Sequence, residues 1–322
     1  MAAVGRCSSL VTTLRPVNVT DDLEDLWQVA VECERAVIPE VTTTHEEIRS
    51  ALTGPGVDLD SGVRAAVDDT GFIEGYVATE LDPEGREVIV DAYARPGVDA
   101  SVIDVLLAHG LSYARAEAAK LDDPTGWICG AGAFVGDDVY VKALSNAGFT
   151  PVRRFHRMRI DFTEVDRQDV PTLPGGTTIA VVSEDDQRIV HEVLEEAFVG
   201  HWRHVHRSWD DWISYFRNRG YDPSQWWLVT VDGEPAAAMV GNEGFAEVGS
   251  SYVSMLGVLP QYRGRGLGRA LLLTAFEEAA SRGRTSVRLG VDTENGTGAP
   301  ALYASVGMTP VETIEAYEQP LD

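Results

Sequence analysis

Lysine is nearly absent from this sequence of 322 residues, in which Lys120 and Lys142 are the only lysines. Acidic residues outnumber basic residues by 51 to 26, and the formal net charge is −25. A surface this acidic repels phosphate groups, so no nucleic-acid partner is expected, and it favours a cationic substrate. The same balance is also typical of a protein that is simply very soluble, and both interpretations stay open.

Cysteines and long hydrophobic runs are scarce as well. Cys7, Cys33 and Cys129 are odd in number and widely spaced, which predicts neither a disulfide framework nor a paired metal site. No apolar run approaches the roughly 18 residues that a membrane span needs. Residues 1–7 lack the pattern of a secretion signal. We therefore expect a cytoplasmic protein that contacts no membrane and holds no metal.

An internal repeat divides the chain into two halves. The segment ALSNAGFTPV at 143–152 is similar to LYASVGMTPV at 302–311. The beginnings of the halves agree too, because LRPV at 14–17 and IAVV at 179–182 each precede a polar cluster and a helical pattern. Agreement at both ends, in register, favours duplication. The predicted organisation is one domain at 1–162, a polar linker at 163–176 and a second domain at 177–322.

The second half is predicted to alternate strands and helices. Ser183 is placed to begin a helix with a capping box, since Asp186 follows three residues later. The expected strands are 178–182, 226–231, 234–240, 252–258, 286–291 and 308–314, and the expected helices are 183–199, 209–219, 268–282 and 298–306. The first half follows the same order, with strands at 63–68, 72–81 and 87–94 and a helix at 101–120. This order predicts an α/β (α+β) fold in which helices flank a mixed, mostly antiparallel sheet.

A glycine-rich loop carries the chemistry of the second half. The segment VLPQYRGRGLGR at 258–269 runs from the end of a strand to the start of a helix. Glycines let successive N–H groups point into one hollow, and the helix N-terminus adds partial positive charge, so the loop suits a pyrophosphate. A dinucleotide loop would need glycine at 269, where Arg269 stands, and a P-loop would need Gly-Lys-Ser/Thr.

The Arg-x-x-Gly-x-Gly pattern of this loop resembles the acetyl-CoA loop of the GCN5-related N-acetyltransferase (GNAT) superfamily. The segment DTENGTGAPALYASVGM at 292–308 is similar to the second motif of that family. The two-half layout resembles tandem GNAT proteins of the mycothiol synthase type. The resemblance implies two tandem GNAT-like domains, acetyl-CoA as co-substrate, and Tyr303 as the acid that protonates the departing thiolate. The cofactor-binding residues that it implies are Leu256, Gly257, Val258, Arg263, Gly264, Arg265, Gly266, Leu267, Gly268, Arg269 and Asn295.

The first half departs from this pattern. Its corresponding loop, RPGVDAS at 95–101, has one glycine, and Asp99 would repel a phosphate. Leu144 takes the place of Tyr303. We expect this half to be degenerate and non-catalytic, with cofactor binding lost.

Aromatic residues cluster before the glycine loop, where the acceptor would bind. Trp202, Trp209 and Trp212 are candidate walls for a cationic or apolar substrate, with packing as the alternative. His201, His204 and His206 lack the spacing of a metal site. A proton relay through one of them stays open.

The general base is the hardest residue to assign. Amine acetylation needs a group that removes a proton, and Glu243 and Glu247 lie near the turn before the cofactor strand. The terminal carboxylate of Asp322 is another candidate. Mycothiol synthase-like proteins carry a glutamate on the cofactor strand, and the resemblance aligns Tyr252 with that position here.

The expected function is direct transfer of an acyl group from acetyl-CoA to the amine of a small, possibly cationic, metabolite. The alternatives are protein N-terminal or mycothiol-type acetylation, and a CoA- or metabolite-binding protein without catalysis.

Overall fold

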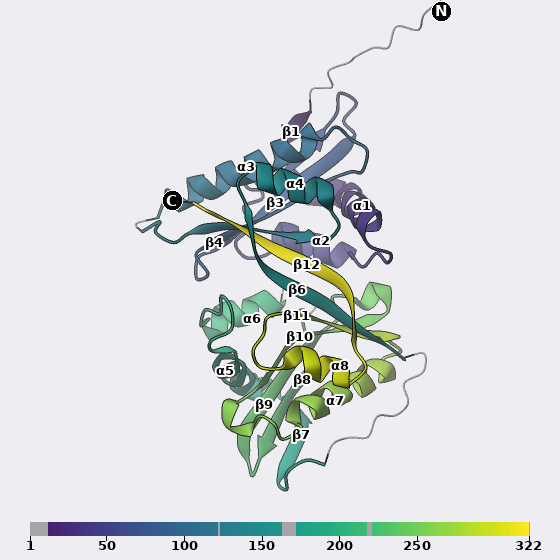
Figure 1. The fold of residues 1–322 in the computed structure, drawn as a ribbon, viewed down its shortest axis with the longest axis vertical. Helices are drawn as coiled ribbons and strands as arrows, with labels where there is room; N and C mark the ends of the chain where they lie inside the picture. Colours follow the sequence, from purple (N-terminus) through teal and green to yellow (C-terminus); the bar gives the residue numbers. More distant parts are fainter. Residues whose placement is uncertain (1–11, 122, 163–171, 218–220, 322) are drawn as a thin grey trace, which may run out of the picture.

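A computed structural model describes residues 12–121, 123–162, 172–217 and 221–321. Cys7, the N-terminal residues 1–7, Asp322 and most of the predicted linker lie outside these residues. Figure 1 shows two lobes, with the first half of the sequence above and the second half below, and two long strands crossing between them.

One sheet of twelve strands runs through both lobes, in the order β1-β2-β3-β4-β5-β12-β6-β11-β10-β9-β8-β7. Most neighbours are antiparallel, while β4–β5 and β10–β11 are parallel. The strands of the first half are β1 (Thr13–Arg15), β2 (Arg64–Val67), β3 (Ile73–Asp82), β4 (Glu87–Ala94), β5 (Ile128–Phe134) and β6 (Thr150–Asp161). Those of the second half are β7 (Thr177–Val181), β8 (Tyr221–Val231), β9 (Glu234–Asn242), β10 (Ser250–Val258), β11 (Ser286–Asp292) and β12 (Thr309–Pro320). The predicted fold class is confirmed.

The last strand of each half completes the sheet of the other half, which the sequence did not indicate. β6 pairs with β11 from Phe155–Asp292 to Asp161–Ser286, and β12 pairs with β5 from Ile314–Phe134 to Pro320–Ile128. The two exchanged strands also pair with each other (Figure 1). The boundaries 1–162 and 177–322 stay a prediction, but neither range contains a whole sheet by itself.

Helices pack on both faces of the sheet in each lobe. In the upper lobe α1 (Val19–Val37) and α2 (His45–Thr53) share one core, and α3 (Ser101–Ala118) and α4 (Asp138–Asn146) share another. In the lower lobe the corresponding pairs are α5 (Gln187–Phe198) with α6 (Trp209–Arg217), and α7 (Leu267–Ser281) with α8 (Ala299–Ser305). In the part of the chain that the structure describes, no helix is long and apolar enough to cross a membrane.

The helix predicted to begin at Ser183 begins later. A 3₁₀ turn at Glu184–Asp186 precedes α5, and no side chain caps this turn. The Ser183 hydroxyl donates instead to the Asp186 carboxylate at 2.7 Å. The capping-box prediction is wrong because these two side chains satisfy each other rather than the backbone.

Candidate active site

Two parallel strands part in the middle of the lower lobe. β10 and β11 pair from Ser250–Ser286 to Val253–Leu289, but β10 continues to Val258. A register shift between Val253 and Met255 marks the same place on the β9 side of β10. Such an irregularity bends a strand, so the two strands separate beyond it.

A cavity of about 520 Å³ occupies the opening, and we call it the strand-gap cavity. Most of the cofactor-binding residues that the sequence predicted line this cavity, and so do Tyr303 and Trp202. The predicted residues that line it are Trp202, Leu256, Gly257, Val258, Arg263, Gly264, Gly266, Leu267, Gly268, Arg269, Asn295 and Tyr303. Arg265 is not among the lining residues. Its guanidinium donates to the Gln261 carbonyl at 3.0 Å and lies over the Tyr262 ring.

The glycine loop leads into an uncapped helix N-terminus. Gly264 and Gly266 have φ of 72° and 84°, in the left-handed region that glycine adopts without strain. No side chain caps α7, so the N–H groups of its first turn have neither a capping nor an intrahelical acceptor. These donors and the helix dipole create positive potential, which suits an anion.

Two arginines of the loop donate hydrogen bonds to backbone carbonyls. The Arg263 guanidinium donates to the Val258 carbonyl at 3.0 Å and the Ala197 carbonyl at 3.1 Å. Arg269 donates to the Ser305 carbonyl at 2.8 Å. Both acceptors of Arg263 are neutral carbonyls, so its guanidinium charge adds to the positive potential of the loop.

Gly257 is required by packing. A Cβ atom at this position would lie 2.7 Å from the Ala197 Cβ and 3.0 Å from Leu194 Cδ2. Helix α5 therefore packs directly on the backbone of β10 and closes one side of the strand-gap cavity.

Tyr303 lies on α8 and is 8% exposed. Burial raises the pKa of its hydroxyl to about 12, so the group stays protonated at neutral pH and is able to donate a proton.

A second cavity of about 580 Å³, which we call the interlobe cleft, is lined by residues of both lobes. His204, Ser254 and Met255 line both cavities, so the two meet there. The upper lobe contributes Glu46, Glu47, Glu80 and Asp91, and the lower lobe contributes Glu195, Trp212 and Tyr252.

The three predicted tryptophans have different surroundings. Trp202 lies near Phe155 in the strand-gap cavity, with ring centroids 5.8 Å apart. Trp212 is buried and lines the interlobe cleft. Trp209 lines neither cavity and stacks on Trp212 at 5.8 Å.

The structure does not bring Glu243 or Glu247 into either cavity. The Glu243 carboxylate forms ion pairs with Arg282 and Arg284 and accepts a hydrogen bond from Gln225. The Glu247 side chain is half exposed, and its carboxylate lies 3.3 Å from the His45 ring. Glu47 was not selected from the sequence. Its Thr-x-x-Glu pattern indicates a helix start, and nothing in that pattern indicates a cavity.

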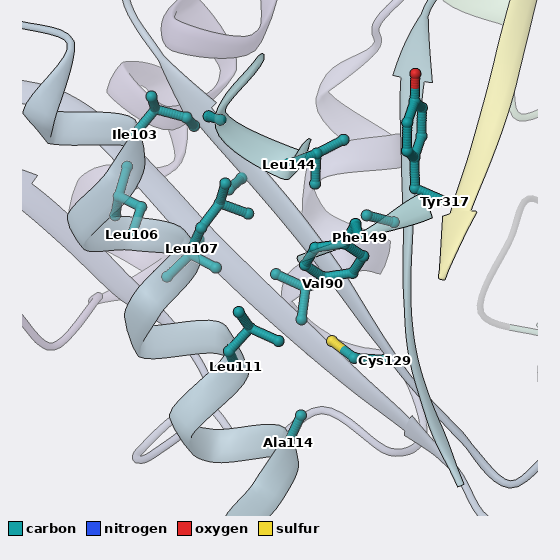
Figure 2. Packing of buried hydrophobic residues seen from close by; sticks show 14 of the residues in the cluster. Val90, Ile103, Leu106, Leu107, Leu111, Ala114, Cys129, Leu144, Phe149 and Tyr317 are labelled. Carbon is teal, nitrogen blue, oxygen red and sulfur yellow. The ribbon is translucent and has the colours of Figure 1, made fainter. Parts of the chain in front are cut away.

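The upper lobe contains a corresponding pair of parallel strands. β4 and β5 pair only from Glu87–Ile128 to Ile89–Gly130, and both strands then continue. Figure 2 shows Leu144 and Phe149 in the hydrophobic core that also contains Val90 of β4 and Cys129 of β5. Leu144, which matches Tyr303 in the internal repeat, is fully buried. Arg95 fixes the loop after β4, because its guanidinium donates to the Ile73 carbonyl at 2.8 Å and forms an ion pair with Glu32.

Among the residues that the structure describes, no group of three His, Cys, Asp or Glu side chains is placed to hold a metal ion.

Comparison with known proteins assigns the lower lobe to a family. Residues 188–308 match the model of the acetyltransferase (GNAT) family. This part of the chain is a GNAT domain. Among curated proteins, the chain is similar to the mycothiol acetyltransferase of Beutenbergia cavernae, at 29% identity over 290 residues, covering 87% of this chain and 90% of that protein. It is also similar to the mycothiol acetyltransferase of an Arthrobacter species, at 25% identity over 278 residues, covering 83% and 78%.

Solved structures extend the likeness to both lobes. A GCN5-related N-acetyltransferase from Sphaerobacter thermophilus superposes with a TM-score of 0.81 at 22% identity, covering 96% of each chain. A tandem GNAT protein from the clavulanic acid biosynthesis pathway superposes with a TM-score of 0.72 at 14% identity, covering 97% of this chain and 99% of that one. The predicted tandem GNAT fold and the enzyme class, acetyltransferase, are confirmed.

Proposed function

We propose that this GNAT protein transfers an acyl group from acetyl-CoA to the amine of a small, cationic acceptor. The observation that carries this proposal is the meeting of the strand-gap cavity and the interlobe cleft at His204, Ser254 and Met255. A donor in the first cavity and an acceptor in the second would bring a thioester and an amine together at that junction. Direct transfer needs this proximity.

The strand-gap cavity has the features that acetyl-CoA needs. Among the residues that the structure describes, no strand pairs after Val253 with the edge of β10 that faces β11, so its backbone groups are available to the amides of a pantetheine arm. The loop amides from Gly264 to Arg269, with Arg263 beside them, would hold the pyrophosphate. Asn295 lines the same cavity.

The interlobe cleft has an excess of acidic side chains. Its arginines are each paired with a carboxylate from outside the lining: Arg157–Glu312 at 3.1 Å, Arg203–Glu318 at 2.6 Å and Arg207–Asp82 at 2.5 Å. The carboxylates within the lining are Glu46, Glu47, Glu80, Asp91 and Glu195. An acceptor that carries positive charge is favoured in such surroundings. Trp212 and Phe216 in the same lining add aromatic surface for it.

The reaction needs two proton transfers. The amine nitrogen attacks the thioester carbonyl, the C–N bond forms and the C–S bond breaks. A base takes a proton from the amine, and Tyr303 gives its hydroxyl proton to the thiolate sulfur. Tyr303 then recovers a proton from solvent.

The test is release of CoA thiol from acetyl-CoA over a panel of polyamines, amino sugars and amino-acid amides, with carboxylic acids and thiols as matched controls. Turnover with cationic amines supports the proposal, and turnover with anionic or thiol acceptors alone contradicts the acceptor class. Binding of acetyl-CoA without acceptor-dependent thiol release would favour a CoA-binding protein.

A mycothiol-type acceptor is the second candidate, because the relatives named mycothiol acetyltransferases match most of this chain. The amine acceptor of those enzymes belongs in the same panel. A kcat/KM for it at least tenfold above that of every other amine would establish this alternative.

A further inference from the structure

Helix α2 of the upper lobe packs against the lower lobe and carries the carboxylate of Glu47. The Thr44 hydroxyl donates to the Gly244 carbonyl at 3.3 Å, and the His45 ring contacts the Glu247 carboxylate at 3.3 Å. Both contacts fix the N-terminus of α2 against the segment between β9 and β10. Glu47 follows in the same helical turn.

Glu47 lines the interlobe cleft together with Tyr252, Ser254 and Met255 of β10. Ser254 and Met255 also line the strand-gap cavity. Glu47 therefore lines the cleft that meets the strand-gap cavity, and it interacts with Tyr252, two residues before Ser254 on β10. The capping box of α2 uses only the Oε2 atom of Glu47, which accepts from the Thr44 N–H at 2.9 Å.

The surroundings of Glu47 suit a proton acceptor near neutral pH. Burial raises the pKa of its carboxyl to about 7, with Glu34 of α1 acting in the same direction and Arg157 of β6 opposing it. The hydroxyls of Tyr252 on β10 and Tyr76 on β3 interact with the same carboxylate. A base whose pKa lies near the working pH combines the deprotonated form with useful basicity.

Two other carboxylates of the cleft are already engaged. Glu195 accepts a hydrogen bond from the Arg207 N–H at 3.2 Å and lies 3.6 Å from His204. Glu46 is 47% exposed and lies 3.7 Å from Arg49 on the same helix, as expected for a surface pair. Glu80 and Asp91, on β3 and β4, share the lining and complete the charged groups on this side.

We propose that Glu47, from the otherwise non-catalytic half, is the general base for the acceptor amine. This inference rests on the proposed function. In the step, Glu47 takes a proton from the amine as its nitrogen bonds to the thioester carbonyl carbon, and the protonated carboxyl later returns that proton to solvent. The sulfur leaves with the proton of Tyr303, so charge and protons balance.

The test compares Glu47→Gln with Glu46→Gln. Glutamine at position 47 keeps an acceptor for the Thr44 N–H, so the capping box survives while the base is lost. Glu46→Gln removes the same charge from the neighbouring position of the cleft. The measurements are kcat and KM for the best amine from pH 5 to 9, and acetyl-CoA affinity by calorimetry.

We expect Glu47→Gln to lower kcat by about 10²–10⁴-fold with little change in acetyl-CoA affinity, which is the usual range for loss of a general base. Glu46→Gln removes one charge from the acidic lining, so it should raise the KM for the amine while kcat stays within about threefold and still falls below pH about 7. The unchanged protein should show a fall in kcat below pH about 7, as Glu47 becomes protonated, and Glu47→Gln should lack this fall.

Equal kcat and the same pH profile in Glu47→Gln would overturn the inference while leaving the proposed function intact. If no amine supports turnover by the unchanged protein, the proposed function itself fails. If Glu47→Gln does not fold, the pH profile of the unchanged protein decides, because a rate that does not fall below pH about 7 excludes Glu47 as the base.

Discussion

Replacing Glu47 by glutamine should stabilise the protein at alkaline pH, even though it removes the proposed base. In the folded protein the pKa of Glu47 is raised from 4.5 to about 7. Between these two values the folded state binds more protons than the unfolded state, so the free energy of unfolding falls as pH rises. At about 1.4 kcal/mol per pH unit this loss amounts to at most about 3 kcal/mol by pH 8. Glutamine does not titrate and avoids the loss.

The assay is urea unfolding of the unchanged protein, Glu47→Gln and Glu46→Gln at pH 5 and pH 8. Near pH 5 Glu47 is mostly protonated and resembles glutamine, so the first two proteins should have similar midpoints. At pH 8 Glu47→Gln should be more stable by about 1–3 kcal/mol, while Glu46→Gln should show no such pH-dependent difference. Other titrating groups are common to all three proteins and cancel. Equal stability of Glu47→Gln and the unchanged protein at both pH values would refute the described surroundings of Glu47.

Three further predictions concern the strand-gap cavity. Tyr303→Phe keeps the buried ring and removes the proton donor, so kcat should fall at least about tenfold with unchanged acetyl-CoA affinity; a normal kcat, where chemistry limits the rate, would remove Tyr303 from the mechanism. Gly266→Asp should weaken acetyl-CoA binding by at least about tenfold relative to Gly266→Asn, which has the same size and tolerance of positive φ without the charge. Equal acetyl-CoA affinities of the two Gly266 variants in calorimetry would contradict a pyrophosphate at this loop. In the unchanged protein, two acetyl-CoA sites per chain would contradict the expected loss of binding in the upper lobe. Gly257→Ala should cost about 1–3 kcal/mol of unfolding free energy because its Cβ would overlap Ala197, whereas Gly296→Ala, with open space around it, should be neutral in the same denaturation assay.

The glycine loop and its flanking elements were predictable because their signals are local. A strand, a loop with glycines at positive φ and a helix start all lie within residues 250–281, and each depends on neighbours in the sequence. Hydrophobic spacing likewise located α7 and β11 to within one residue at most ends. Tyr303 was expected from the resemblance of residues 292–308 to a family motif, and it lines the same cavity as the loop.

The exchange of strands was not predictable from these signals. β12 pairs with β5 across more than half of the chain, and the sequence of a strand does not by itself identify the strand that it pairs with. Closeness in the sequence is also an unreliable guide to which carboxylates reach a cavity. Glu243 lies close to β10 in the sequence, but its side chain pairs with Arg282 and Arg284, just beyond the C-terminus of α7, and lines neither cavity.

The exchanged strands show how the upper lobe contributes to the strand-gap cavity of the lower lobe. β6 forms the strand next to β11, so it contributes Phe155 to the wall of the strand-gap cavity. Arg153 of the same strand holds Asp292, at the end of β11, through two hydrogen bonds of 2.9 and 2.7 Å. Without β6 the parted end of β11 would be an exposed sheet edge with an unpaired carboxylate. The upper lobe therefore supports the geometry of the strand-gap cavity through β6 and supplies acidic side chains of the interlobe cleft through α2.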